Sequence, residues 1–134
     1  MSYRFMLDTN VISDLIRDPM GKVSRQIEDE GESSICTSII VASELRYGVA
    51  KSGSSELSLR VDAALSAIEI LPFDTPADTE YGKLRAHLAT KGKLIGPNDL
   101  LIAAHALFLD LTLVTDNARE FKRVKGLSVV NWRR

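Results

Sequence analysis

The stretch Phe5-Met6-Leu7-Asp8-Thr9-Asn10 is the part of the sequence that decides the fold. Three apolar residues run directly into Asp8, and a hydroxyl and an amide side chain follow it. A short, continuously apolar run of this kind is typical of a strand that is buried on both faces of a parallel sheet. In open α/β sheets, ligands bind just beyond the carboxyl ends of the strands. The sequence therefore predicts that Asp8 faces a binding crevice at a sheet edge.

Length and composition limit the classes of protein to consider. With 134 residues the chain has the size of one domain, and we expect a single domain over residues 1–134. The formal net charge of −1 gives no global signature of nucleic-acid binding, so a polyanionic partner would need a local basic patch or a bound metal. The single cysteine excludes an internal disulfide and fits a cytoplasmic location. Because no apolar run approaches the ~18 residues of a membrane helix, no membrane association is expected.

Apolar segments with strand character alternate along the chain with segments of helical periodicity. The expected strands are residues 4–8, 33–37, 70–73, 111–115 and 128–130. The expected helices are residues 9–16, 21–30, 38–50, 57–68, 75–92, 97–109 and 117–122. Alternation of short apolar strands with helices is typical of a parallel sheet covered on both faces. The predicted fold class is an α/β three-layer α/β/α sandwich with a parallel sheet of about five strands.

Four carboxylates occupy positions where a solvated charge is not normally placed. Asp8 and Asp116 each follow an expected strand, Glu44 lies beside the apolar stripe of helix 38–50, and Asp99 lies in the first turn of helix 97–109. An aspartate in these positions can simply cap a helix or complement its dipole. Glu44 needs a partner, because a carboxylate near an apolar face is otherwise costly. Convergence of all four in one crevice would raise some of their pKa values unless a cation were bound.

The donor atoms of this acidic set indicate which cation would suit it. All are oxygens, with no cysteine or histidine at ligand spacing, which favours Mg²⁺, or Mn²⁺ as a substitute, over Zn²⁺. One or two such ions can orient a water for phosphodiester hydrolysis and let an acidic pocket accept a polyanion. Thr9, Asn10, Thr115 and Asn117 flank the acids and could hydrogen-bond a carboxylate, a water or a phosphate.

Taken together, four motifs resemble the PIN domain, and more narrowly the VapC-type toxins of bacterial type II toxin–antitoxin systems. They are Leu7-Asp8-Thr9-Asn10, Ser43-Glu44-Leu45-Arg46-Tyr47-Gly48, Gly96-Pro97-Asn98-Asp99 and Thr115-Asp116-Asn117-Ala118-Arg119-Glu120-Phe121. Any one of these motifs is weak by itself. Their order, spacing and flanking residues together make the resemblance specific, and it extends from residue 4 to Trp132.

The resemblance implies a PIN-like Mg²⁺-dependent endoribonuclease that hydrolyses RNA phosphodiester bonds, and so inhibits translation and growth until an antitoxin neutralises it. Asp8, Glu44, Asp99 and Asp116 would be the metal-binding and catalytic residues. Some VapC-type members carry Asn at the position of Asp116. Glu120 falls where the family often carries an acid near the site.

The resemblance also implies partners. The RNA substrate would include tRNA, and some members of the family cut initiator tRNA. A cognate VapB-type antitoxin would block the site, and the toxin would form a homodimer and a toxin–antitoxin hetero-oligomer. Operator DNA would be bound only through the antitoxin.

Other interpretations remain open at this stage. His87 and His105 could act as acid and base in a metal-free ribonuclease, although a histidine within a helix more often packs or faces solvent. A phosphatase that uses Asp8 as a nucleophile would carry a second aspartate where this chain has Asn10. The same fold could also serve as a non-catalytic RNA- or protein-binding module. Arg119 and other basic residues could line an RNA-binding rim.

Overall fold

The computed structural model describes residues 2–133 of the chain. Within these residues a parallel sheet has the strand order β3-β2-β1-β4-β5. Its strands are β1 (Phe5–Leu7), β2 (Ile35–Ser38), β3 (Glu69–Leu71), β4 (Thr112–Val114) and β5 (Val129–Val130). The sheet, with helices on both faces, confirms the predicted fold class.

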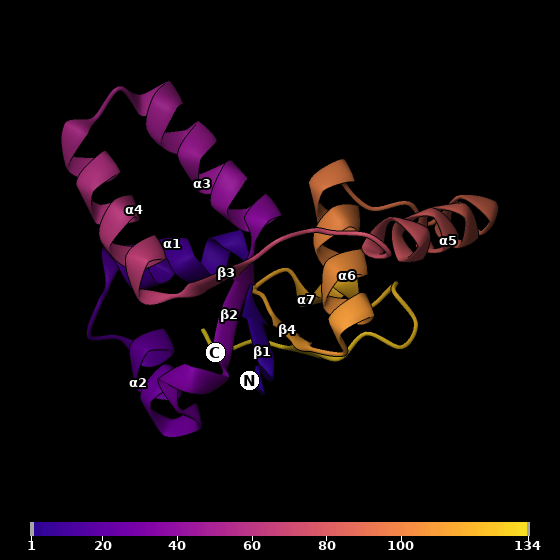
Figure 1. The fold of residues 1–134 in the computed structure, drawn as a ribbon, viewed down its shortest axis with the longest axis horizontal. Helices are drawn as coiled ribbons and strands as arrows, with labels where there is room; N and C mark the ends of the chain where they lie inside the picture. The colour runs from indigo at the N-terminus through magenta and orange to yellow at the C-terminus, as the bar shows by residue number, and fades with distance from the viewer. Residues whose placement is uncertain (1, 134) are drawn as a thin grey trace.

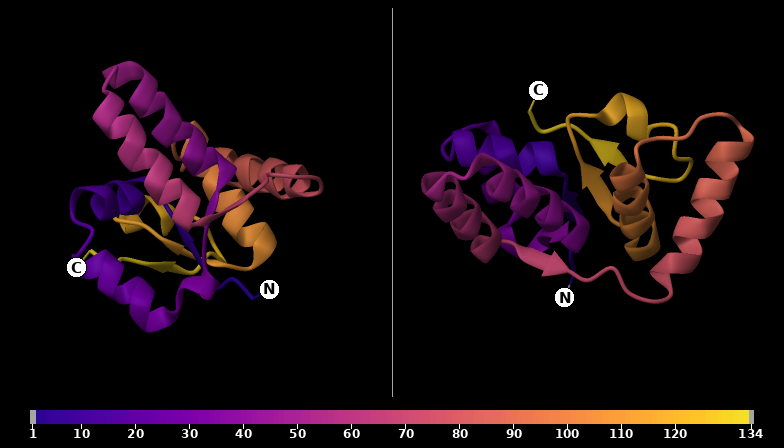
Figure 2. Two further views of the ribbon diagram at one scale, coloured as in Figure 1. Left: turned by 60° about the vertical axis from the view of Figure 1, so that its left-hand side comes forward. Right: turned by 90° about the horizontal axis from the view of Figure 1, so that it is seen from above.

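The helices form two outer layers around the sheet (Figure 1). One layer contains α1 (Thr9–Arg17), α2 (Lys22–Glu30), α3 (Ile39–Ser52) and α4 (Ser55–Ala67). The other contains α5 (Ala77–Thr90), α6 (Pro97–Leu109) and the short α7 (Ala118–Phe121). Figure 2 shows the same two layers from other sides, with α3 and α4 lying side by side and projecting beyond the sheet. Among residues 2–133, no helix is long and apolar enough to span a lipid bilayer.

The register of the sheet determines which side chains meet at its carboxyl edge. Leu7 of β1 is aligned with Thr37 of β2 and with Val114 of β4. Since all three strands are parallel, the residues that follow them must emerge at the same edge. Asp8 and Thr115 are therefore neighbours there, at the edge where the sequence predicted Asp8 and Asp116.

Capping side chains set where the helices around this edge begin. The Asp8 carboxylate accepts a hydrogen bond from the Thr9 backbone N–H at 2.8 Å and so caps α1. Ser38 caps α3 by accepting from the Ile40 N–H at 3.0 Å. Pro97 occupies the first turn of α6, where a backbone N–H would have no hydrogen-bond partner within the helix, so its absence costs nothing. Both α3, which carries Glu44, and α6, which carries Asp99, therefore start at the sheet edge.

All five strands differ by one or two residues at their ends from the sequence prediction, and two of these differences have a clear physical cause. Residues Glu32–Ser34 form a 3₁₀ turn instead of strand, and the Ser34 hydroxyl donates to the Gly31 carbonyl at 2.7 Å. The third strand covers Glu69–Leu71 and not residues 70–73. Pro72 ends it, because proline has no N–H to donate to the sheet.

Candidate active site

A cavity of about 490 Å³ lies at the carboxyl edge of the sheet. Its lining consists of Asp8, Thr9, Asn10, Ser13, Arg17, Glu44, Asp99, Asn117 and Arg133. Three of the four carboxylates singled out in the sequence therefore meet in one cavity. They come from the end of β1, from α3 and from the first turn of α6.

Asp8 is buried at the floor of this arrangement, with 4% of its surface exposed. One carboxylate oxygen accepts from the Thr9 N–H, and the other accepts from the Thr115 hydroxyl at 2.7 Å. Burial raises the pKa of Asp8, while the hydrogen bonds from Thr115 and Thr9 oppose that rise. Asp8 is thus both a helix cap and a cavity carboxylate, and the two roles do not exclude each other.

Glu44 has the partners that its place beside an apolar stripe requires. The Thr9 hydroxyl donates to one oxygen of the Glu44 carboxylate. The Asn98 side-chain amide donates to the other at 3.2 Å. Glu44 on α3 is therefore tied to both α1 and α6, and its carboxylate is held at the cavity wall.

Asp99 has the most perturbed acidity in the cavity. Burial, followed by repulsion from Asp8, Glu120 and Glu44, raises the pKa of Asp99 to about 6. Asp8, Glu44 and Asp99 line the same cavity, and like charges placed so close together raise one another's pKa values. This is the electrostatic condition that the sequence predicted for a converged acidic set.

The cavity is suited to a hard divalent cation. The atoms in its lining that could ligate a metal are the oxygens of carboxylates, hydroxyls and side-chain amides. No group of three histidine, cysteine, aspartate or glutamate side chains within residues 2–133 already stands in metal-binding geometry. At least one carboxylate would therefore have to turn toward the ion.

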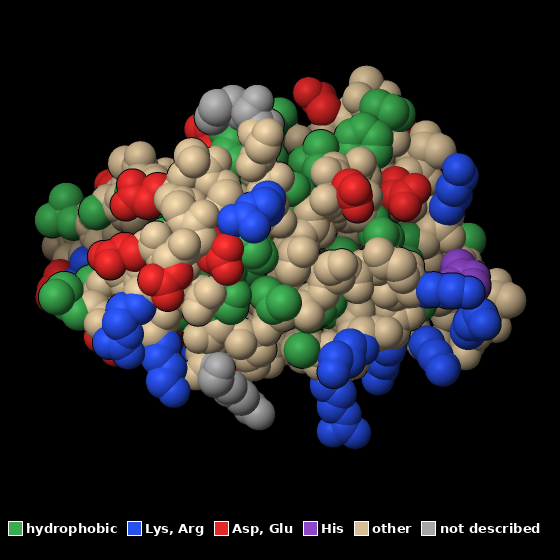
Figure 3. All heavy atoms as spheres, turned by 90° about the horizontal axis from the view of Figure 1, so that it is seen from below, with side chains coloured by type: hydrophobic (Ala, Val, Ile, Leu, Met, Phe, Trp, Pro, Cys, Tyr) green, Lys and Arg blue, Asp and Glu red, His purple; other side chains and the backbone are tan. Residues whose placement is uncertain are grey.

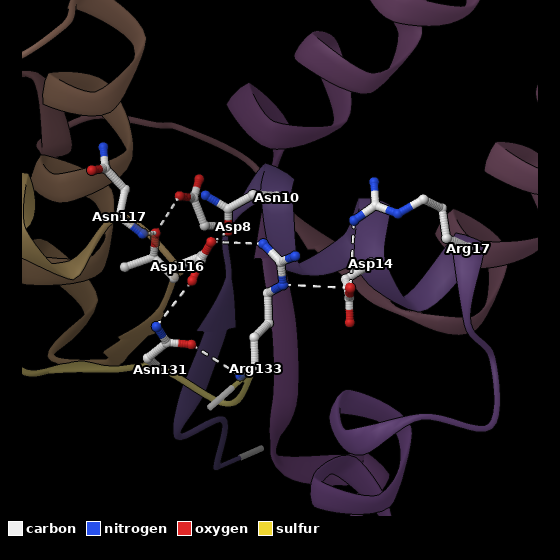
Figure 4. A network of polar contacts seen from close by, with 9 residues as sticks. Asp8, Asn10, Asp14, Arg17, Asp116, Asn117, Asn131 and Arg133 are labelled. Atoms are coloured by element: carbon white, nitrogen blue, oxygen red, sulfur yellow. Dashed lines mark hydrogen bonds and ion pairs between the residues drawn. The ribbon is translucent and has the colours of Figure 1, made fainter.

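Asp116 lies at the same edge of the sheet but outside the cavity lining (Figure 4). Its two carboxylate oxygens accept from the Asn131 amide at 3.0 Å and from Nη1 of Arg133 at 2.7 Å. Its backbone N–H donates to the Asn10 side chain at 3.0 Å. The structure thus links Asp116 to the segment after β5, and links Asn10 to the turn after β4.

Glu120 connects α7 to the loop that carries Asp99. Its carboxylate accepts from the Asn117 amide at 2.9 Å and from the Gly96 N–H at 3.1 Å, and these two bonds lower the pKa of Glu120. The Asn117 N–H in turn donates to the Thr115 hydroxyl at 3.0 Å. Glu120 and Thr115 therefore position cavity residues without lining the cavity themselves.

The basic residues that the sequence predicted for an RNA-binding rim are not among those that line the cavity. Arg119 is exposed on α7 and is not among the residues that line the cavity. Lysine and arginine side chains gather at the α5 end of the molecule in Figure 3. The exposed basic residues of α5 and the loop after it are Lys83, Arg85, Lys91 and Lys93.

Three charged residues near the cavity were missed by sequence reasoning. Asp14 forms ion pairs at 3.4 Å with both Arg17 and Arg133. The sequence contained a pattern that could have identified two of them. Asp14 and Arg17 lie four and seven residues after Asn10, which places all three on one face of α1. Arg133 follows the last strand by three residues, which places it at the same sheet edge.

Comparison with known proteins assigns the family. Residues 5–127 match the family model of the PIN domain. The chain is 42% identical over 130 residues to ribonuclease VapC2 of Rickettsia felis, covering 96% of this chain and 97% of that one. This chain belongs to the VapC family of PIN-domain proteins. The VapC-family chain is also 39% identical to the tRNA(fMet)-specific endonuclease VapC of Shigella flexneri, with 96% and 98% covered.

Solved structures give the same assignment. The VapC-family chain superposes on the VapBC2 structure from Rickettsia felis, bound to a DNA fragment from their promoter, with a TM-score of 0.88. The two share 40% identity over 96% of this chain and 98% of that one. DNA-bound VapBC from Salmonella typhimurium gives a TM-score of 0.88 and 36% identity over 97% and 98%. The predicted family and PIN-like fold are therefore confirmed.

Proposed function

We propose that this VapC-family protein is the toxin of a type II toxin–antitoxin system and acts as a metal-dependent endoribonuclease. The observation that carries the proposal is the meeting of Asp8, Glu44 and Asp99 in one cavity, where burial, together with repulsion from the neighbouring carboxylates, raises the pKa of Asp99 to about 6. Relatives named ribonuclease and endonuclease support the reaction class. The substrate that we propose is RNA, with tRNA, including initiator tRNA, suggested by the name of the Shigella relative.

Mg²⁺ is the proposed metal, with Mn²⁺ as a substitute. Asp8, Glu44 and Asp99 would hold it, and Asp116 is the fourth proposed carboxylate at the same edge. When bound, the ion would supply Lewis-acid activation of water and offset the charge of the phosphate. For Asp116 to reach the ion, its carboxylate would have to release the hydrogen bond from Arg133 or Asn131.

The chain's own side chains supply positioning. Thr9 and Thr115 orient the Asp8 carboxylate, and Thr9 and Asn98 orient that of Glu44. Asn10 and Asn117 place polar groups in the cavity beside the expected path of the RNA backbone. We propose that water, and not the ribose 2′-OH, attacks phosphorus, so that cleavage leaves a 5′-phosphate and a 3′-OH.

We further propose a cognate VapB-type antitoxin that neutralises this activity in the cytoplasm. The toxin would form a homodimer and assemble with the antitoxin into a hetero-oligomer. Operator DNA would be bound through the antitoxin. The VapBC complexes among the similar structures, two of them bound to DNA, support this set of partners.

Sequencing of RNA 5′ ends after brief expression tests the proposal and identifies the substrate. We expect discrete new ends within one class of RNA when the unsubstituted protein is expressed. The Asp8→Ala variant should produce none of them, although it is folded. Growth arrest without new RNA ends would instead favour a non-catalytic binding module.

A further inference from the structure

We propose that Arg17 and Arg133 form a phosphate-binding subsite in the wall of the acidic cavity, which takes a backbone phosphate next to the one that is cleaved. This inference rests on the proposed ribonuclease function. Both arginines line the cavity that contains Asp8, Glu44 and Asp99. A cavity with carboxylates and guanidinium groups in its walls can bind a metal and a phosphodiester side by side.

The two guanidinium groups are held in place by a shared carboxylate. The Asp14 carboxylate of α1 forms ion pairs with Nη2 of Arg17 and with Nε of Arg133, each at 3.4 Å (Figure 4). Nη1 of Arg133 also donates to Asp116 at 2.7 Å. These ion pairs therefore connect α1 to the segment after β5 in the wall of the cavity. Fixing the donors before RNA binds reduces the side-chain entropy that binding would otherwise cost.

These ion pairs leave donors available for a ligand. A guanidinium carries five N–H donors, and its planar fork matches the oxygens of a phosphate. Arg133 uses Nε and Nη1, and within residues 2–133 its Nη2 group has no hydrogen-bond partner. Arg17 contacts Asp14 through Nη2, and its side chain is 62% exposed. Both residues can therefore donate to a phosphate while Asp14 still holds them.

The charge of the cavity wall supports a phosphate ligand. Three carboxylates and two guanidinium groups line the cavity, so their formal charges of −3 and +2 sum to −1. One divalent cation would bring this sum to +1, which suits a phosphodiester. Asp14 and Asp116, which pair with these guanidinium groups, lie outside the lining. Without Arg17 and Arg133 the charged residues of the lining would all be carboxylates, so the two guanidinium groups supply the positive charge that a phosphate needs in this wall.

A purely structural role for these ion pairs makes a different prediction. If Arg133 only fastens the segment after β5, its removal should lower thermal stability and leave RNA affinity per folded molecule unchanged. If it binds phosphate, RNA affinity and its dependence on salt should both change, because each phosphate contact releases counterions.

The test measures the affinity of a fluorescent single-stranded RNA in EDTA, where the proposed function predicts no cleavage, over a range of salt concentrations. The variants are Arg133→Ala, Arg17→Ala and Arg133→Lys. Arg4→Ala is the matched control, since Arg4 is also an arginine in an ion pair, at 3.0 Å to Glu30, but lies before β1 at the opposite edge of the sheet. Melting temperatures check that each variant is folded.

We expect each alanine variant in the cavity wall to bind RNA about 10-fold more weakly, with the slope of log affinity against log salt reduced by about 0.7. Arg133→Lys should lie between Arg133→Ala and the unsubstituted protein, since lysine keeps the charge without the fork. Arg4→Ala should change affinity by less than about twofold.

Equal affinities and equal salt slopes for Arg133→Ala, Arg17→Ala and Arg4→Ala would overturn the subsite. So would a complete absence of RNA binding by the unsubstituted protein in EDTA, because the guanidinium pair needs no metal. RNA cleavage with Mg²⁺ is measured in parallel on the unsubstituted protein. Cleavage without the expected binding differences refutes the subsite alone, whereas no cleavage of any RNA refutes the proposed function.

Discussion

Replacing Asp8 with Asn is expected to lower the rate of RNA cleavage by about 10²–10³-fold, without loss of the fold. The substitution removes a buried carboxylate that touches both the cavity and the first turn of α1. The Asn carbonyl can still accept from the Thr9 N–H, and its amide can donate to the Thr115 hydroxyl, which has two lone pairs. Shape and hydrogen bonds are thus kept while the charge is lost.

The same variant should unfold at a higher temperature than the unsubstituted protein when no metal is present. Asp99, whose pKa is about 6, is ionised at pH 7 and repelled by Asp8. A raised carboxyl pKa means that this destabilisation is absent below about pH 4 and complete above about pH 6. The gain in melting temperature from Asp8→Asn should therefore be larger at pH 7.5 than at pH 4.

Thermal unfolding and cleavage assays on the same preparations check both results. Asp29→Asn on the exposed face of α2 is the matched control, and it should change neither quantity measurably. A folded Asp8→Asn protein that cuts RNA at the unsubstituted rate would show that the cavity is not the active site.

Replacing His105 with Ala is expected to lower the free energy of unfolding by about 2–4 kcal/mol, with little change in cleavage per folded molecule. His105 of α6 is 1% exposed, and its Nδ1 lies 2.8 Å from the hydroxyl of Ser38, the cap of α3. Its ring meets that of Phe73 edge-on at 5.3 Å. The substitution would leave a cavity in the core and remove a partner of the Ser38 hydroxyl.

This result would also decide against catalysis by two imidazoles. Burial holds the pKa of His105 below its ordinary value, so the ring stays neutral at physiological pH. His87 is exposed on α5, and neither histidine lines the acidic cavity. His87→Ala is therefore the control, with no expected effect on stability or cleavage. Loss of cleavage by a well-folded His87→Ala or His105→Ala protein would support the metal-free mechanism instead. Chemical denaturation and cleavage assays supply both numbers.

The sequence predicted the centre of the site because that centre depends on simple geometric rules. Apolar runs that end in Asp8 and Thr115-Asp116 indicate parallel strands, and parallel strands end at one edge. Glu44 was recognisable because a carboxylate beside an apolar stripe needs partners, which proved to be Thr9 and Asn98. Pro97 fixed the start of α6 and hence the place of Asp99.

The surroundings of Asp116 were beyond sequence reasoning because they depend on contacts between distant segments. Nothing in the order of residues indicates that Arg133 would bridge Asp116 and Asp14. Side-chain directions around the last strand depend on how the chain packs after it. The end of β3 was predicted wrongly, at residue 73, although Pro72 carried the signal for an earlier end because it cannot donate to the sheet.

The most direct test of the central claim, that water activated in the cavity of Asp8, Glu44 and Asp99 hydrolyses RNA, is the chemistry of the cut ends. Purified protein is incubated with its RNA and Mg²⁺, and the termini are identified by mass spectrometry. The account predicts a 5′-phosphate and a 3′-OH, and no cleavage in EDTA. A 2′,3′-cyclic phosphate, formed through the ribose 2′-OH, would contradict it.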